Sequence, residues 1–232
     1  MLVGTLFWIS NLATLVGGAI TGTIPGAAGA LADFFPHQTQ IVVGTLINHL
    51  NDAAIIAYAV ALFPVLRLFG QGPALAYVAF KLVEGVLLLV AAAVLLSMIP
   101  LSQTYIQGGS GSASSLRAVA EVTLSQQFWA GRLAALVYLV ATTILNVMLY
   151  RSRLVPRFIA IWGLIATVLL ATGLAAGVGS PTGGFQLGQV LVIPIILWEL
   201  LFATWLIVRG FNPGAFAGEV GREAEPQTAA SR

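Results

Sequence analysis

The sequence contains no cysteine and very little charge. Without cysteine, the chain has no disulfide bonds, thiolate catalysis, cysteine-ligated zinc or iron–sulfur clusters. Charged residues make up 8% of the 232 residues, and one of the ten basic residues is a lysine, Lys81. A soluble globular domain carries roughly a quarter charged residues. With 59% hydrophobic residues, the chain lacks the polar surface that a water-soluble protein of this size needs. The composition therefore predicts a membrane protein.

Six apolar stretches are long enough to cross a bilayer, which takes about 20 residues. The fold class that they predict is all-α, a polytopic bundle of six transmembrane helices in one domain, residues 1–211. A signal peptide would have a basic start and a shorter apolar core, so the first stretch is expected to be a retained span. Residues 212–232 are small, polar and charged, and predict a disordered cytoplasmic tail. The expected spans are residues 2–24, 41–68, 74–99, 128–150, 158–178 and 189–208.

Three features of the sequence concern helix packing and the connections. Gly18, Gly22 and Gly26 recur at a small-xxx-small spacing, which predicts close approach of a neighbouring helix to the first span. The segment 115–125 is expected to form a short interfacial helix, because its apolar residues lie on one side. The Gly/Ser-rich residues 107–115 lack the Gly-Lys-Ser/Thr ending of a phosphate-binding loop, so they predict a flexible linker.

Arginines at the ends of the apolar stretches predict the orientation of the chain. If the N-terminus is cytoplasmic, nearly all of these arginines face the cytoplasm, as the positive-inside rule requires. Arg117 and Arg132 then lie toward the outside. We therefore expect both termini to be cytoplasmic. The residues that set this topology are Arg67, Arg151, Arg153, Arg157 and Arg209.

Ionisable residues inside the spans are the candidates for function, because a lone charge at the bilayer centre costs at least about 2.5–3.5 kcal/mol. At about 1.5 Å per residue, Asp52, Glu84 and Glu199 each lie roughly 15 Å from the start of their helix. All three carboxylates therefore reach the midplane and are not expected to face lipid. Lys81 precedes Glu84 by three residues and shares its helix face. The candidates for a buried polar or ligand site are Asp52, Lys81, Glu84, Glu199, His49 and Arg132.

These candidates have structural and functional interpretations. Lys81 and Glu84 can simply hold helices together, or the acids can line a polar cavity or proton relay in which Lys81 changes partner. Three acids outnumber the single midplane base, which favours a role beyond one salt bridge. His49, one turn from Asp52, is either a satisfied polar residue or a relay partner. Arg132, about one turn into its span, either snorkels to the outer surface or pairs with an acid.

The sequence shows no motif for metal binding or hydrolysis. His37 and His49 lie in different regions without the spacing of metal ligands, and no Gly-x-Ser-x-Gly occurs. We expect no cofactor, no metal site and no catalytic residue. The leading hypothesis is a protein that binds or moves a small solute or proton. The alternatives are a non-catalytic accessory or structural subunit and, third, an intramembrane enzyme acting on lipid. Expected partners are membrane lipids and a small solute, proton or membrane subunit, with no nucleic acid.

The last third of the chain carries a family resemblance. The strongest segments are Tyr150-Arg-Ser-Arg-Leu-Val-Pro-Arg-Phe-Ile-Ala-Ile-Trp-Gly-Leu164 and the stretch from Pro194 through Glu199-Leu-Leu-Phe-Ala-Thr-Trp-Leu-Ile-Val-Arg-Gly-Phe211. Weaker similarity covers Asn51-Asp52 and Phe80-Lys-Leu-Val-Glu84. In these residues the chain resembles the uncharacterised bacterial membrane family DUF4386. The resemblance implies six helices and residence in the bacterial cytoplasmic (inner) membrane, but no activity, cofactor or substrate.

Overall fold

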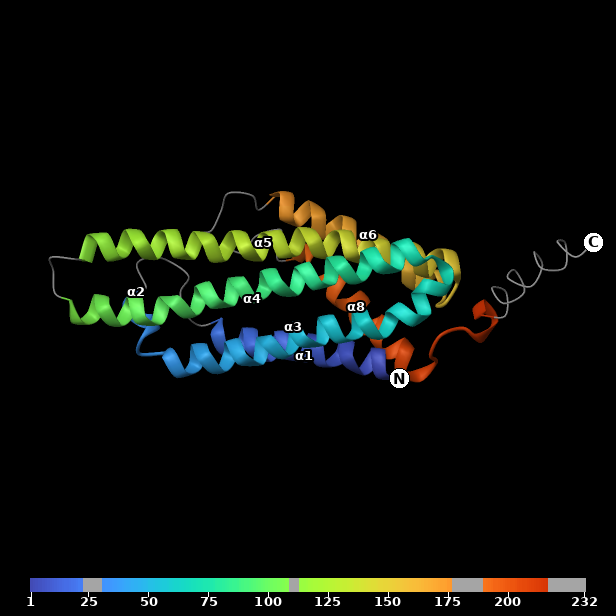
Figure 1. Cartoon of the computed structure of the whole chain (residues 1–232), viewed down its shortest axis with the longest axis horizontal. Helices are drawn as coiled ribbons and strands as arrows, with labels where there is room; N and C mark the ends of the chain where they lie inside the picture. Colours follow the sequence, from blue (N-terminus) through green and yellow to red (C-terminus); the bar gives the residue numbers. More distant parts are fainter. Residues whose placement is uncertain (23–30, 109–112, 177–189, 217–232) are drawn as a thin grey trace, which may run out of the picture.

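The computed structural model describes residues 1–22, 31–108, 113–176 and 190–216. Regular secondary structure in these ranges is helical, which confirms the all-α prediction (Figure 1). The elements are α1 (Leu2–Thr21), α2 (Leu31–Phe34), α3 (Gln38–Leu66), the 3-10 turn η2 (Arg67–Phe69), α4 (Gln71–Gln107), α5 (Ala113–Ser152), α6 (Arg157–Ala176) and α8 (Ile193–Val208).

Five helices in the described ranges are long and apolar enough to cross a membrane: α1, α3 with η2, α4, α5 and α6. The helix α8 is also apolar but has 16 residues, fewer than the sixth span predicted from the sequence. That predicted span begins at residue 189, which lies outside the described residues. These helices mark the chain as a multi-pass membrane protein.

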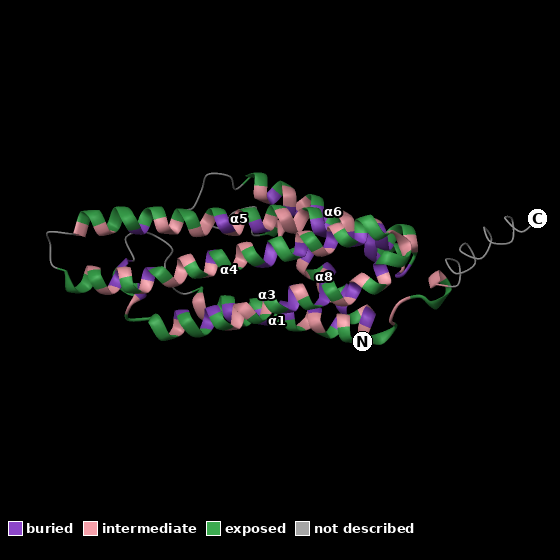
Figure 2. Cartoon of the chain, viewed as in Figure 1, coloured by how far each residue is buried: buried purple, intermediate pink, exposed green. Residues whose placement is uncertain are grey.

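In the described part of the chain, the five long helices and α8 close into a ring. Each packs against the next in the order α1, α3, α4, α5, α6 and α8, and α8 returns to pack against α1. Figure 1 shows α3, α4 and α5 as long rods that run roughly along the same axis. Large side chains such as Tyr58, Trp198 and Phe202 are fully buried between the helices. Exposed residues line the outer faces of the rods (Figure 2), and many of them, such as Leu46 and Val168, are apolar, as contact with lipid requires.

The helices α4 and α5 extend well beyond their predicted spans. They have 37 and 40 residues, which at 1.5 Å per residue is about 55–60 Å, roughly twice the hydrocarbon thickness of a bilayer. In Figure 1 both project past the neighbouring helices at one end. A second apolar core joins this projection to α2 and to the start of α3. Its buried members are Leu31, Phe34, Ile41, Met98 and Ala120.

The segment from Ser115 to Ser125 is the first part of α5, so the prediction of a separate interfacial helix is wrong. Leu116 and Leu124 pack against the second core, so the apolar side of this segment contacts protein. No proline or glycine occurs between Ser115 and Phe128, and nothing in the sequence interrupts the helix before the apolar span. In the predicted linker ahead of it, residues 109–112 lie outside the described residues.

The close approach of α1 to α3 occurs at Gly17 and not at Gly18. A Cβ at Gly17 would collide with the Asn48 side chain, whereas one at Gly18 would meet open space. A Cβ at Gly22 would meet the backbone of α1 itself, and Gly26 lies outside the described residues. The packing face is thus offset by one residue from the predicted one, about 100° around the helix.

Residues 212–216, which we predicted as the start of the tail, contact the bundle. The backbone N–H of Asn212 donates to the carbonyl of Leu154 at 2.9 Å. Ala215 and Phe216 pack against the main core, and the Phe216 ring centroid lies 6.1 Å from that of Phe69. The bundle therefore includes at least the first five residues of the segment. Residues 217–232 lie outside the described residues.

The five arginines predicted to set the topology lie at one end of the bundle, here called the arginine end. Arg151, Arg153 and Arg157 line one cavity together with Phe69, which shares η2 with Arg67. Arg209 directly follows α8. Both the start of α1 and the end of α8 lie at this end, because Met1 and Phe211 line another cavity together. The charge distribution is thus strongly one-sided.

Candidate functional site

An ion pair on α4 forms the centre of the candidate site. The Nζ atom of Lys81 lies 2.9 Å from Oε2 of Glu84, and both side chains are almost fully buried, at 3% and 5% exposed. The spacing of three residues places the two groups on one helix face. Gly85 follows directly, and a Cβ there would crowd Ile56 on α3, so α3 and α4 lie close together at this level. Loss of either partner would leave a buried, uncompensated charge.

Tyr138 on α5 connects this ion pair to Glu199 on α8. Its hydroxyl donates to Oε1 of Glu199 at 2.7 Å, and its ring centroid lies 4.4 Å from Nζ of Lys81. The ring centroid of Tyr58 on α3 lies 5.5 Å from the same ammonium. Because the face of an aromatic ring attracts a cation, one carboxylate and two rings hold the Lys81 ammonium. Four helices meet around this single charge.

The helix α1 contributes Asn11 to the same cluster. Asn11 is a second side-chain hydrogen-bond partner of Glu199, and its amide also donates to the carbonyl of Phe7 at 3.0 Å. Lys81 attracts Glu199 from beyond salt-bridge distance while it remains paired with Glu84. In the described part of the chain, the direct hydrogen-bond partners of Glu199 are therefore neutral. We call Lys81, Glu84, Tyr138 and Glu199 the midplane cluster.

Asp52 lies outside the midplane cluster and contacts His49. Its Oδ2 atom lies 2.8 Å from Nδ1 of His49, and its Oδ1 atom accepts from the Asn51 amide at 3.4 Å. The hydroxyl of Ser10 on α1 in turn donates to the Asn51 side-chain oxygen. The His49 side chain is 28% exposed and that of Asp52 is 9% exposed. The acid is thus mostly buried beside Asn51, which contacts α1, and the histidine reaches the surface of the bundle.

A cavity of about 340 Å³ lies beside the midplane cluster, and residues from α1, α3, α4, α5, α6 and α8 line it. Its walls are mostly apolar, with side chains such as Ile55, Leu88 and Leu170. Of the candidates predicted from the sequence, Glu84 and Glu199 line the cavity, whereas Asp52, Lys81, His49 and Arg132 do not. The polar residues that line it are Ser10, Asn11, Thr14, Asn51, Tyr58, Glu84, Tyr138 and Glu199.

Arg132 is not part of the midplane cluster. Its Nη1 atom donates to the carbonyl of Leu174 in the last turn of α6 at 3.0 Å. Its guanidinium carbon lies 5.0 Å from the ring centroid of Phe128. Because carbonyl groups at a helix C-terminus favour a nearby cation, Arg132 stabilises the end of α6.

The neutral residues of the site, above all Tyr138 and Asn11, were not among the candidates predicted from the sequence. Tyr138 lies about 15 Å from the start of the predicted fourth span, by the same argument that located the carboxylates. Asn11 lies about 14 Å from the start of α1. Tyrosine in a span is normally found at the membrane interface. A tyrosine or asparagine at mid-depth is therefore a usable signal of a buried polar site.

The chemistry of the site is that of carboxylate, phenol and amide groups. In the described residues, no group of three or more His, Cys, Asp or Glu could hold a metal ion. The carboxylates at the cavity wall can accept hydrogen bonds, attract a cation or take up a proton. The apolar walls favour the uncharged part of a ligand.

The family model of a domain of unknown function, DUF4386, matches residues 2–210. The chain belongs to the DUF4386 family. The match covers α1, α3, α4, α5, α6 and α8 and every residue of the cavity beside the midplane cluster, and it confirms the resemblance that the sequence showed most strongly over residues 150–211. Neither the curated proteins nor the solved structures give a match.

Proposed function

We propose that this protein binds or moves a small solute or proton through the cavity inside its helix ring. It would act in the bacterial cytoplasmic (inner) membrane with both termini in the cytoplasm. The observation that supports this proposal best is the position of Glu199. This carboxylate lines the cavity, and within the described residues its hydrogen-bond partners are the neutral groups of Tyr138 and Asn11.

The cavity has the size and lining of a small-molecule site. Its volume of about 340 Å³ is at the lower end of the usual range for ligand pockets. Apolar walls with a few convergent polar groups are typical of such pockets, because the walls provide affinity and the polar groups fix the orientation. We expect a compact ligand with an apolar body and one polar group directed toward Glu199.

The charges around the cavity favour a cationic or protonated ligand. The two carboxylates Glu84 and Glu199 are balanced by one ammonium, that of Lys81, which is paired directly with Glu84. One negative charge therefore remains when both acids are ionised. A cation at Glu199, or a proton taken from the ligand, would remove this buried charge. For this reason we expect the solute to be a cation or to carry a proton that it can give to Glu199.

The arginine end supports the proposed orientation. Positive charge accumulates in cytoplasmic loops, and Arg67, Arg151, Arg153, Arg157 and Arg209 lie together at the end where α1 begins and α8 ends. The opposite half of the bundle has Arg117 and Arg132. Both termini are then on the cytoplasmic side.

One observation favours the alternative function, that of an accessory subunit. Both ion pairs of the described residues, Lys81 with Glu84 and His49 with Asp52, are complete within single helices. Complete pairs are also what a purely structural role requires. The two functions differ in whether water and solutes enter the cavity, which an experiment can measure directly.

Because the chain has no native cysteine, a single introduced cysteine reports whether a water-soluble reagent reaches its position. Ser10→Cys and Ala135→Cys place a thiol on the cavity wall, while Ala160→Cys places one at a fully buried position on α6 away from the cavity. We expect a small, membrane-impermeant thiol reagent added from one side to label the first two and not the third. Absence of labelling at both cavity positions in a folded protein would exclude a solute-accessible site and favour the subunit.

The ligand can then be sought by thermal unfolding of the purified protein with a panel of small amines and neutral amphiphiles. Glu199→Gln should abolish any ligand-dependent increase in melting temperature, because it removes the cavity carboxylate that is not paired with Lys81 and barely changes the size of the side chain. Glu121→Gln is the matched control, since Glu121 is an exposed acid on the projecting part of α5. Equal loss of the effect in both variants would argue against binding at Glu199.

A further inference from the structure

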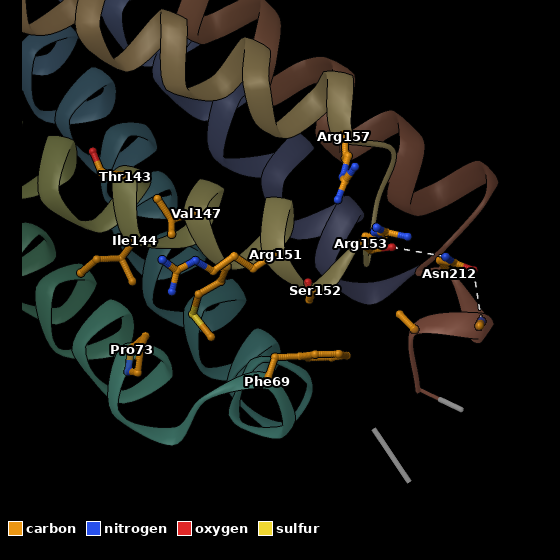
Figure 3. Close-up of a pocket in the computed structure, with 13 residues that line it drawn as sticks. Phe69, Pro73, Thr143, Ile144, Val147, Arg151, Ser152, Arg153, Arg157 and Asn212 are labelled. Atoms are coloured by element: carbon orange, nitrogen blue, oxygen red, sulfur yellow. Dashed lines mark hydrogen bonds between the residues drawn. The ribbon is translucent and has the colours of Figure 1, made fainter. Parts of the chain in front are cut away.

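The connection between α5 and α6, residues 153–156, forms part of a large cavity at the arginine end (Figure 3). The cavity has a volume of about 990 Å³, and Arg151, Arg153 and Arg157 line it. Figure 3 shows Arg151 lying back along α5 toward Ile144, whereas Arg157 extends from the start of α6 toward the connection. Three arginines, from the end of α5, the connection and the start of α6, thus line one depression.

A second cavity, of about 360 Å³, adjoins the first on the other side of the same connection. It shares Arg153, Arg157 and Asn212 with the larger cavity and adds Arg209 and Trp205. Positive charge is therefore concentrated around one short connection and not spread along the end of the bundle. A tryptophan at this position is typical of the headgroup region of a membrane.

Tertiary contacts hold the connection in a fixed conformation. Arg153 has a φ of 55°, in the left-handed region that non-glycine residues seldom adopt. The Asn212 backbone N–H donates to the Leu154 carbonyl at 2.9 Å, and its side-chain amide donates to the Arg153 carbonyl at 3.3 Å. Leu154 and Val155 are buried in the main core. The arginines are thus presented on a rigid support, as a binding site requires.

These arginines have no acidic partner in the described part of the chain. Arg157 lies 5.2 Å from the ring centroid of Tyr150, a neutral contact, and neither ion pair found there includes an arginine. The positive-inside rule accounts for arginines at this end but not for the presence of three of them along one cavity. Arg67 satisfies the same rule and lines neither cavity. Three arginines that line one cavity without a carboxylate offer an anion several charged hydrogen-bond donors.

We propose that these joined cavities bind a phosphate group, carried either by an anionic phospholipid headgroup or by a soluble phosphate ester. The planar guanidinium group matches two phosphate oxygens at once. Basic depressions between transmembrane helices on the cytoplasmic side suit anionic headgroups. The larger cavity also has an apolar wall of Pro73, Ile144 and Val147, which suits the glycerol backbone and first acyl carbons of a lipid.

The test titrates the purified full chain in a neutral detergent with phosphatidylglycerol or, separately, with phosphatidylcholine. Bound lipid is measured by native mass spectrometry. We expect tighter binding of phosphatidylglycerol, and Arg151→Gln and Arg157→Gln should each weaken it roughly tenfold, because each removes charge-assisted hydrogen bonds. Arg157→Lys should give a smaller loss, since it keeps the charge but not the planar donor geometry.

Arg67→Gln is the matched control, because it removes an exposed arginine from the same end outside the cavities. It should leave the affinity for phosphatidylglycerol unchanged. Competition by glycerol 1-phosphate or inorganic phosphate would identify a soluble phosphate ester as the occupant, and its absence would identify the lipid. Equal affinity for both lipids, or an equal loss in Arg67→Gln and Arg157→Gln, would overturn the proposal.

Discussion

Tyr138 on α5 contacts Glu199 and Lys81, two charged residues of other helices, at the same time. Its hydroxyl donates to the Glu199 carboxylate at 2.7 Å, and its ring centroid lies 4.4 Å from the Lys81 ammonium. Glu199 is on α8 and Lys81 is on α4, so one neutral side chain couples three helices. The hydroxyl and the ring serve different partners, so substitution can separate their contributions.

Tyr138→Phe keeps the ring beside Lys81 but removes the donor to Glu199. We expect the free energy of unfolding to fall by about 1–2 kcal/mol, because interhelical hydrogen bonds in membranes are individually modest but this one satisfies a buried carboxylate. Equilibrium unfolding in detergent micelles measures the change. Binding of any ligand found for the cavity should also change, because Tyr138 orients Glu199.

Tyr77→Phe is the control for this prediction. The Tyr77 side chain is fully buried, and its hydroxyl has no hydrogen-bond partner within the described residues. Removal of a hydroxyl that forms no bond should leave stability unchanged or slightly increased. If Tyr77→Phe destabilises the protein as much as Tyr138→Phe, then loss of the Glu199 hydrogen bond does not explain the effect.

The ion pair between Lys81 and Glu84 predicts strongly non-additive substitutions. Glu84→Gln leaves the Lys81 ammonium buried without its closest carboxylate, which should cost about 3–5 kcal/mol. Lys81→Met leaves two buried carboxylates near each other and should cost a similar amount. The double variant removes both charges of the pair, so it should be more stable than the sum of the single effects predicts.

A double-mutant cycle on purified protein measures this coupling. A cycle in which the effects of Glu84→Gln and Lys81→Met simply add would show that the pair contributes little. The same cycle with Glu199 in place of Glu84 should give a smaller coupling, since Glu199 lies beyond salt-bridge distance from Lys81.

The fold was largely predictable because burial in a bilayer imposes simple requirements on a sequence. Apolar runs of about 20 residues identify spans, and ionisable residues at mid-depth must avoid lipid. These two rules identified the helical segments and directed attention to Glu84 and Glu199, which line the cavity. They also selected Asp52, which contacts His49 and is not part of the midplane cluster. The depth of a residue along a helix does not specify which side of the helix it occupies.

Features that depend on contacts between helices were not predictable in the same way. Tyr138 and Asn11 are neutral, so a rule that selects charged residues at mid-depth does not identify them. A glycine repeat indicates that two helices approach closely but not which face of the helix makes the contact. In α1 the residue that contacts α3 is Gly17 and not Gly18. The full length of α5 was missed because hydropathy falls at its polar first turns, although nothing there breaks a helix.

The contact between α5, α6 and α8 at Gly163 gives a third prediction. A Cβ at Gly163 would collide with the Asn146 amide and the Trp198 indole nitrogen, which itself donates to the Ile159 carbonyl at 2.9 Å. Gly163→Ala should therefore cost about 1–3 kcal/mol through overpacking. Gly18→Ala is the control, because a Cβ there meets open space, and it should be neutral or stabilising by up to about 1 kcal/mol. Thermal unfolding of the two variants compares them, and equal melting temperatures would contradict the close packing at Gly163.

The one-sided distribution of arginine predicts the orientation of the chain. Five arginines lie at the end where α1 begins and α8 ends, so a fluorescent protein fused after residue 216 should fold in the cytoplasm and fluoresce. Alkaline phosphatase, which is active outside the cytoplasm, should be active when fused after Gln107 and inactive when fused after Arg153. Replacement of Arg151, Arg153 and Arg157 by glutamine should weaken the preference of the arginine end for the cytoplasm, because it removes most of the charge difference between the two ends of the bundle. Phosphatase activity of the fusion after residue 216 would show the opposite orientation or an odd number of spans.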